Sequence, residues 1–145
     1  MNASQDERNL GMIAHGLVVL TGVTTVLSAL GAIGWLASIA SVVLYFVWKS
    51  KGPFVTRHAK QAAGLQVCLF LVGIVLAIFT SIFSVGALAA GSIGGALALG
   101  GLMVIIALAI GVAATVFGIM GLLRAQKGEA YTYPLVGKLI DGINL

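Results

Sequence analysis

Two histidines are the side chains of this sequence best suited to acid–base or metal chemistry. His15 lies about five residues into the first apolar segment, and His58 lies in the basic segment Lys49–Lys60. An ionisable side chain within a membrane is a candidate for function, whereas one near the interface can simply be hydrogen-bonded to a loop or to water. Two imidazoles without a third ligand make a poor metal site, and Cys68 lies deeper in an apolar segment. We therefore expect no metal and no cofactor, and we regard a contact between the two histidines as feasible.

Ser92 is the one serine in a setting similar to that of a catalytic nucleophile. It lies within Gly91-Ser92-Ile93-Gly94, which is similar to an intramembrane serine-protease motif. A serine nucleophile needs a base within hydrogen-bond reach, and the expected topology puts both histidines across the membrane, ~30 Å away. Apolar segments without Asp or Glu, and the absence of HExxH, P-loop and GxGxxG motifs, further argue against catalysis. We therefore expect no enzyme, and Ser92 is interpreted as a turn residue.

The composition indicates an integral membrane protein. Of the 145 residues, 60% are hydrophobic and only 8% are charged, whereas a soluble domain carries about 25% charged residues. Such a chain cannot cover a water-facing surface, which excludes a soluble enzyme and a nucleic-acid-binding module.

Two long charge-free segments predict how often the chain crosses the membrane. The first lies between Arg8 and Lys49, and the second between Lys60 and Arg124. The first alone would be ~60 Å long as one helix, about twice the ~30 Å hydrocarbon core, so each segment should contain two crossings. The sequence therefore predicts one membrane domain, residues 1–145, folded as an all-α four-helix transmembrane bundle. The expected spans are about 10–30, 33–48, 60–85 and 97–123, with turns within 28–34 and 86–95.

The positions of the charges predict the orientation. All of them fall in the N-terminal tail, in the segment Lys49–Lys60, or after Leu123. By the positive-inside rule this side is cytoplasmic, so both termini are expected there. Pro53 suits the first position of the third helix. Pro134 suits the start of a short amphipathic interfacial helix within residues 131–145.

The recognisable residues gather on this cytoplasmic side. We predict that the start of the helix at Pro53 packs against the segment Tyr131–Pro134, the alternative being two independent interfacial anchors. From Pro53 the helical spacing directs Gln61 away from the apolar stripe. The basic segment could bind anionic lipid, dock an acidic partner, or only set the topology. The candidate partner or lipid face comprises His15, Lys49, Lys51, Pro53, Phe54, Arg57, His58, Lys60, Gln66, Tyr131, Tyr133 and Pro134.

Small residues recur every four positions on two of the expected helices. Such stripes allow close approach of helix backbones in lipid, most simply within one chain but also between chains. The expected packing residues are Gly73, Ala77 and Ser81 on the third helix, and Ala107, Gly111 and Thr115 on the fourth.

Three motifs resemble a known family over nearly the whole chain. They are Ala14-His15, the pattern Pro53-Phe54-Val55-x-x-His58-x-Lys60-x-Ala62-x-x-x-Gln66, and the tail Gly128-Glu129-Ala130-Tyr131-Thr132-Tyr133-Pro134-Leu135. Together they resemble small bacterial four-helix membrane proteins related to the channel-type component of the chloroplast inner-envelope import translocon (Tic). Thr56-Arg57 replaces the usual acidic pair, and Gly64-Leu65 replaces Asn-Phe.

The resemblance implies a multi-pass protein of the bacterial inner membrane. Few polar side chains lie in the expected spans, which disfavours an aqueous pore. We therefore expect an accessory or assembly protein that binds a larger membrane complex through its cytoplasmic face. The alternative is a protein-translocation or channel-type component. The expected partners are membrane lipids and either another membrane protein or a second copy of the chain, but not nucleic acid.

Overall fold

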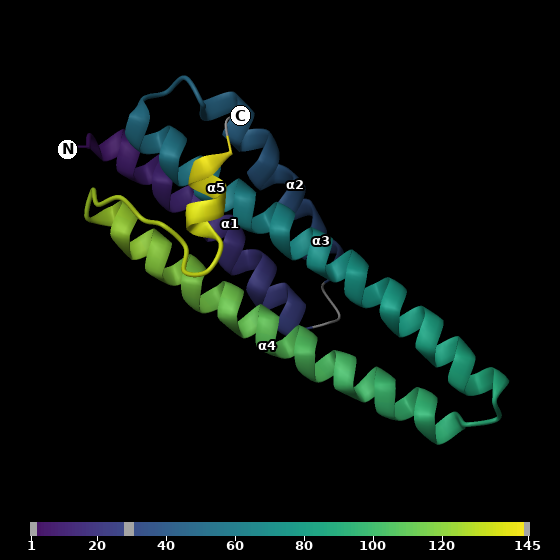
Figure 1. Ribbon diagram of the computed structural model, residues 1–145. Coiled ribbons are helices and arrows are strands. Elements are labelled where there is room, and N and C mark those ends of the chain that lie inside the picture. Colours follow the sequence, from purple (N-terminus) through teal and green to yellow (C-terminus); the bar gives the residue numbers. More distant parts are fainter. Residues whose placement is uncertain (1–2, 28–30, 144–145) are drawn as a thin grey trace.

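The chain folds into helices joined by short connections. The computed structural model describes residues 3–27 and 31–143, and side chains in the second stretch from Ile33 onward. The expectation of an all-α protein is confirmed for these residues (Figure 1). The helices are α1 (Gln5–Val26), α2 (Gly31–Trp48), α3 (Pro53–Ala89), α4 (Ile93–Gln126) and α5 (Gly137–Gly142).

Local sequence signals explain where the long helices begin. Ser4 and Glu7 form a capping box at the start of α1, because each side chain accepts a hydrogen bond from the backbone N–H of the other residue. Pro53 occupies the first turn of α3, as predicted, after Gly52 turns the chain at φ 114°. The Ser92 hydroxyl caps α4, so Ser92 is indeed a turn residue.

The apolar helices differ in length far more than the sequence indicated. Three of the described helices, α1, α3 and α4, are long and apolar enough to cross a membrane, and the apolar part of α2 is shorter. With 37 and 34 residues, α3 and α4 are ~55 Å and ~51 Å long at about 1.5 Å per residue. Both exceed the predicted spans 60–85 and 97–123, and the turn between them is confined to residues 90–92. Of the other predicted turn, residues 28–30 lie outside the described residues, and Gly31–Gly34 are helical.

The long helices continue past the ends of the short ones (Figure 1). The end of α1 lies level with Gly111 of α4, where an added Cβ would meet the Val26 side chain at 3.0 Å. The start of α2 lies level with Phe70 of α3, since the Trp35 and Phe70 rings are 4.9 Å apart. Beyond this level only α3 and α4 remain, as residues 74–89 and 93–107. We call these two stretches the arm, and the rest of the molecule the base.

The buried core lies entirely in the base. Within the described residues, no position from 67 to 110 is buried. The core instead joins α1, α2, the first half of α3, the end of α4 and the C-terminal tail. Its apolar members include Ala14, Val18, Val55, Ala59, Ala62, Leu65, Ala125 and Tyr133. The arm therefore leaves most of its apolar surface uncovered by the rest of the described chain.

The two stripes of small residues behave differently. Gly111 and Thr115 of α4 lie against α1, where a Cβ added at Gly22 would be 2.6 Å from the Thr115 backbone nitrogen. In contrast Gly73, Ala77 and Ser81 of α3 are exposed, and a Cβ at Gly73 would meet no atom within 4 Å. Within this chain Gly73 therefore packs closely against no other helix, and its role in helix packing stays a prediction.

The tail differs from its prediction at the start of its helix. α5 begins at Gly137 rather than at Pro134, because residues 134–136 form a turn in which Leu135 adopts a positive φ of 72°. Ile140 faces α3, and its side chain fills the space above Gly64. Leu139 and Ile143 stay exposed, as an interfacial amphipathic segment requires.

Candidate functional site

The two histidines meet in the core of the base. His15 comes from α1 and His58 from the first turns of α3, and both side chains are 0% exposed. His15 Nε2 lies 2.7 Å from His58 Nδ1, and the rings cross edge to face. The contact that the sequence made feasible is therefore present.

The remaining ring nitrogens bind the C-terminal tail. His15 Nδ1 lies 2.6 Å from the Tyr133 hydroxyl, and His58 Nε2 lies 3.1 Å from the backbone carbonyl oxygen of Glu129. A carbonyl oxygen only accepts, so His58 Nε2–H must be the donor in that bond. With both rings neutral, His58 Nδ1 then accepts from His15 Nε2–H, and His15 Nδ1 accepts from the Tyr133 hydroxyl. The Tyr133 hydroxyl, the His15 ring, the His58 ring and the Glu129 carbonyl thus form a hydrogen-bond chain. Each member donates to the next, so the chain runs from the tail through both histidines and back to the tail.

The tyrosine hydroxyl is suited to the donor role. Burial raises the pKa of Tyr133 well above its ordinary value of 10.0, and the adjacent Tyr131 phenol adds to the rise. Tyr133 therefore keeps its proton at neutral pH, and its hydroxyl donates a hydrogen bond to His15 Nδ1. Tyr131 packs edge to face on both His15 and Tyr133, but its own buried hydroxyl has no partner among the described residues.

The hydrogen-bond chain leaves no histidine nitrogen free for a ligand. All four ring nitrogens of His15 and His58 are bonded within the protein. In the part of the chain that the structure describes, no three His, Cys, Asp or Glu side chains are grouped as a metal site would require. The arrangement can hold the tail in place, and it offers no open coordination position.

Two glycines create the space for the imidazoles. A Cβ at Gly121 of α4 would lie 2.5 Å from His15 Nδ1, and one at Gly11 of α1 would lie 3.4 Å from the His58 ring. A side chain at Gly121 would displace the His15 ring, whereas one at Gly11 would come closest to Ala125 Cβ, at 3.1 Å. Neither glycine was predicted from the sequence, although Gly111, Gly118 and Gly121 recur on one face of α4.

Gln61 is a second connection between α3 and the tail. Its amide nitrogen donates to the Gly137 carbonyl at 3.0 Å and to Asp141 Oδ1 at 2.7 Å, and its oxygen accepts from the Tyr133 N–H at 3.2 Å. Gln61 is fully buried. The sequence placed Gln61 off the apolar stripe of α3, and the tail covers that side of the helix, so Gln61 is buried there.

Exposed contacts complete the junction between α3 and the tail. Arg57 Nη2 donates to Thr132 Oγ1 at 2.9 Å, and Lys60 Nζ donates to the Asp141 carbonyl oxygen at 3.2 Å. The predicted packing of the helix start at Pro53 against the tail is confirmed, and the alternative of two independent anchors is wrong.

Gln66 lies deeper and joins three helices. Its amide nitrogen donates to the Leu17 carbonyl at 3.2 Å and to Thr21 Oγ1 at 2.8 Å, both on α1. Its oxygen accepts from Ser38 Oγ of α2 at 3.0 Å. An unpaired amide in an apolar interior costs ~2–7 kcal/mol, so these bonds fix how the helices meet.

The candidate partner or lipid face divides into buried and accessible parts. The buried residues hold the base together and offer no surface to a partner; they are His15, Phe54, His58, Gln66, Tyr131 and Tyr133. The accessible residues are Lys49, Lys51, Pro53, Arg57, Lys60 and Pro134. Lys49, Arg57 and Lys60 line a shallow hollow of about 510 Å³, in which Asp141 is the one lining carboxylate and pairs with Arg57 at 3.6 Å.

Comparison with known families assigns this architecture. The family model of the magnetosome magnetite crystal formation proteins, MamF/MmsF, matches residues 6–140. The chain belongs to the MamF/MmsF family. The match includes α1 from its second residue, all of α2 to α4, and every residue of the hydrogen-bond chain. No curated protein and no solved structure matches the chain significantly.

The family assignment corrects two expectations from the sequence. The resemblance to the Tic-related proteins is wrong, because the matching family is a magnetosome one. Both expected functions, an accessory subunit of a larger complex and a translocation or channel-type component, are wrong for the same reason. The motifs misled because His15, His58 and Tyr133 fasten a tail to a helical bundle, and such a fastening specifies packing rather than transport.

Proposed function

We propose that this chain is a multi-pass protein of the magnetosome membrane that takes part in magnetite crystal formation. The family match over residues 6–140 carries the proposal, because it spans the whole base and arm rather than one motif. The long apolar helices support the membrane location.

We further propose that both termini and the tail face the cytoplasm. The cations Lys49, Lys51, Arg57, Lys60, Arg124, Lys127 and Lys138 belong to one end of the molecule, and the positive-inside rule favours that end for the cytoplasm. The arm tip then faces the magnetosome interior, where the crystal grows. From residue 61 to residue 123 the sequence has no Asp, Glu or His.

This distribution favours an indirect action on the mineral. Iron in proteins is bound largely by carboxylate, imidazole and thiolate groups. The end of the molecule proposed to face the crystal has no carboxylate or imidazole, so it has no means of templating an iron oxide through ion pairs. We infer that the chain influences crystal formation through the membrane in which it sits.

Deletion of the gene in a magnetite-forming bacterium tests the role in crystal formation. We expect crystals of altered size or shape in electron micrographs, restored by the intact gene on a plasmid. Purified magnetosomes should contain the tagged chain. Unchanged crystals, or a tagged chain confined to other membranes, would refute the proposal.

Single cysteines test the orientation. In a Cys68→Ala background, Ser50→Cys and Ala130→Cys should react with a membrane-impermeant thiol reagent on intact purified magnetosomes, whereas Ser92→Cys should be protected. Intact cells should give the reverse for any copies in the inner membrane. Labelling of Ser92→Cys on intact magnetosomes would show that the orientation is inverted.

A further inference from the structure

The base and the arm differ in cross-section. From the charged end to the level of Gly111 the molecule contains α1, α2, α3, α4 and the tail, and beyond that level only α3 and α4 (Figure 1). The apolar part of the base, from Gly111 to Arg124 on α4, is ~20 Å thick at about 1.5 Å per residue. The arm, from Ile93 to Ala107, adds ~22 Å by the same measure.

The arm has to lie in hydrocarbon. Its side chains are exposed and apolar, with Ile82 64%, Val85 65% and Leu97 71% accessible, and it carries no charge. Base and arm together, from Ile93 to Arg124 on α4, are ~48 Å long at about 1.5 Å per residue, against a hydrocarbon core of ~30 Å and a whole bilayer of about 40–45 Å. With the charged end at one interface and the arm tip near the other, the step between base and arm falls near the middle of the bilayer. Helix tilt shortens both parts but does not change their order.

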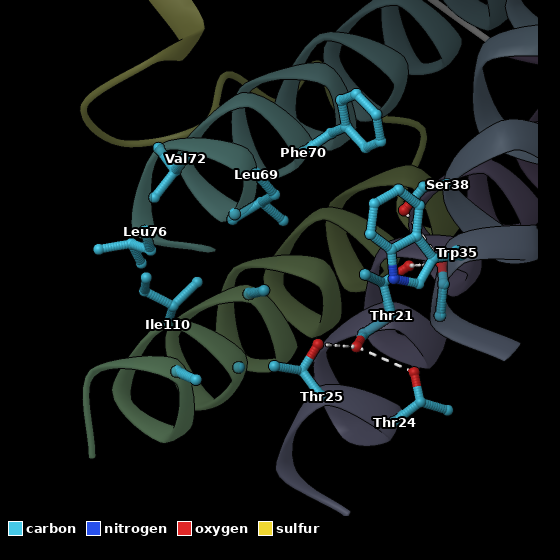
Figure 2. A pocket seen from close by; sticks show the side chains of 15 residues that line it. Thr21, Thr24, Thr25, Trp35, Ser38, Leu69, Phe70, Val72, Leu76 and Ile110 are labelled. Carbon is cyan, nitrogen blue, oxygen red and sulfur yellow. Dashed lines mark hydrogen bonds between the residues drawn. The ribbon is translucent and has the colours of Figure 1, made fainter. Parts of the chain in front are cut away.

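A cavity marks this step (Figure 2). It has a volume of about 410 Å³ and opens where α1 and α2 give way to the arm. The hydroxyls of Thr21 and Thr24 lie on its base side and already bond to backbone carbonyls of α1. Leu76 and Ile110 form part of its apolar wall, which suits an acyl chain from the opposite leaflet.

From this asymmetry we propose that the chain is a membrane wedge that prefers bilayers curved convexly toward its charged end. The base occupies more area in one leaflet than the arm does in the other. The exposed Leu135, Leu139 and Ile143 of the tail widen the broad end further, since amphipathic segments at the interface respond to curvature. The preference is a property of the shape and goes beyond the proposed role in crystal formation. In a vesicle with the charged end outside, the wedge matches the curvature of the membrane.

Reconstitution into vesicles of mixed size tests the wedge. The full chain in a Cys68→Ala background carries either Ser50→Cys at the charged end or Ser92→Cys at the arm tip. An impermeant fluorescent thiol reagent then reports only the outward-facing copies, and single-vesicle imaging gives their density against vesicle diameter. Copies labelled through Ser50→Cys should be about twofold denser, a difference of ~0.4 kcal/mol, in the smallest vesicles than in the largest. Copies labelled through Ser92→Cys should show the opposite trend.

Glycines with open space around them supply matched variants. An added Cβ at Gly86 or Gly101 in the arm, or at Gly16 in the base, meets no atom within 4 Å. The double variant Gly86→Leu, Gly101→Leu thickens the arm and should weaken the dependence on diameter. Gly16→Leu adds the same kind of side chain to the base and should preserve the dependence of density on vesicle diameter. Equal densities at all diameters, trends of the wrong sign, or an arm variant identical to the wild type would each overturn the wedge.

Discussion

Removal of a single hydroxyl tests whether the histidine–tyrosine hydrogen-bond chain stabilises the base. Tyr133→Phe deletes the donor to His15 Nδ1, at 2.6 Å, and leaves a fully buried nitrogen acceptor unpaired. Leaving a buried acceptor without a partner lowers the free energy of unfolding by ~1–3 kcal/mol. For a chain of about this size each kcal/mol corresponds to about 2–4 °C, so Tm should fall by roughly 2–12 °C.

Tyr131→Phe is the matched control for this variant. Tyr131 is also buried and lies against the same imidazole, but its hydroxyl has no hydrogen-bond partner among the described residues. Replacing an unpaired buried hydroxyl by hydrogen should leave Tm unchanged or raise it. The two variants remove the same group from the same residue type, so they differ only in the bond that is lost.

Thermal unfolding in mild detergent, followed by size-exclusion chromatography of the heated samples, measures the two Tm values. Limited trypsin digestion supplies a second measurement, since a loosened tail should be cut faster at Lys127 and Lys138. Equal Tm values for Tyr133→Phe and Tyr131→Phe would refute the inference that the Tyr133–His15 bond holds the tail.

Three further substitutions probe the packing of the base. Gly121→Ala places a Cβ 2.5 Å from His15 Nδ1 and should lower detergent stability by ~1–3 kcal/mol; Gly16→Ala, which meets open space, should be neutral or stabilising. Gln66→Leu leaves its three hydrogen-bond partners to find others and should lower stability by ~1–3 kcal/mol, and a Tm equal to that of the wild type would show that the buried amide is dispensable. Gly111→Leu forces α1 away from α4 and should lower Tm, whereas an unchanged Tm would mean that this face of α4 does not pack on α1.

The sequence predicted the membrane class and the junction between α3 and the tail for clear physical reasons. Long apolar segments without charge are stable in lipid, which gives the membrane class. Proline is favoured in the first turn of a helix, because the N–H that it lacks would have no partner there, and this gives the start of α3. Because the charges put Pro53 and Tyr133 at one end of the molecule, their segments had to lie near each other. The contact observed between them follows from that confinement.

The lengths of the helices could not be predicted in the same way. Hydropathy records how much of a segment prefers lipid, and it is uniform from Gln61 to Leu123. Hydropathy does not show where neighbouring helices end, so the sequence carries no hydropathy signal at the boundary between base and arm. The burial of Gln61 could not be predicted for a related reason: the periodicity of one helix cannot show that a tail more than seventy residues later covers its polar face.

The buried polar side chains explain why residues predicted to form a binding face instead hold the fold together. A membrane interior supplies no water to a histidine or a glutamine, so each of these groups must find its partners within the protein. His15 and His58 form a hydrogen bond with each other, and their other ring nitrogens bond to the tail. Gln66 of α3 bonds to α1 and α2. Together these bonds gather three helices, α1, α2 and α3, and the tail at one end of the molecule. The same residues that resembled a binding site thus create the broad base, and with it the asymmetry that distinguishes this bundle from a cylinder.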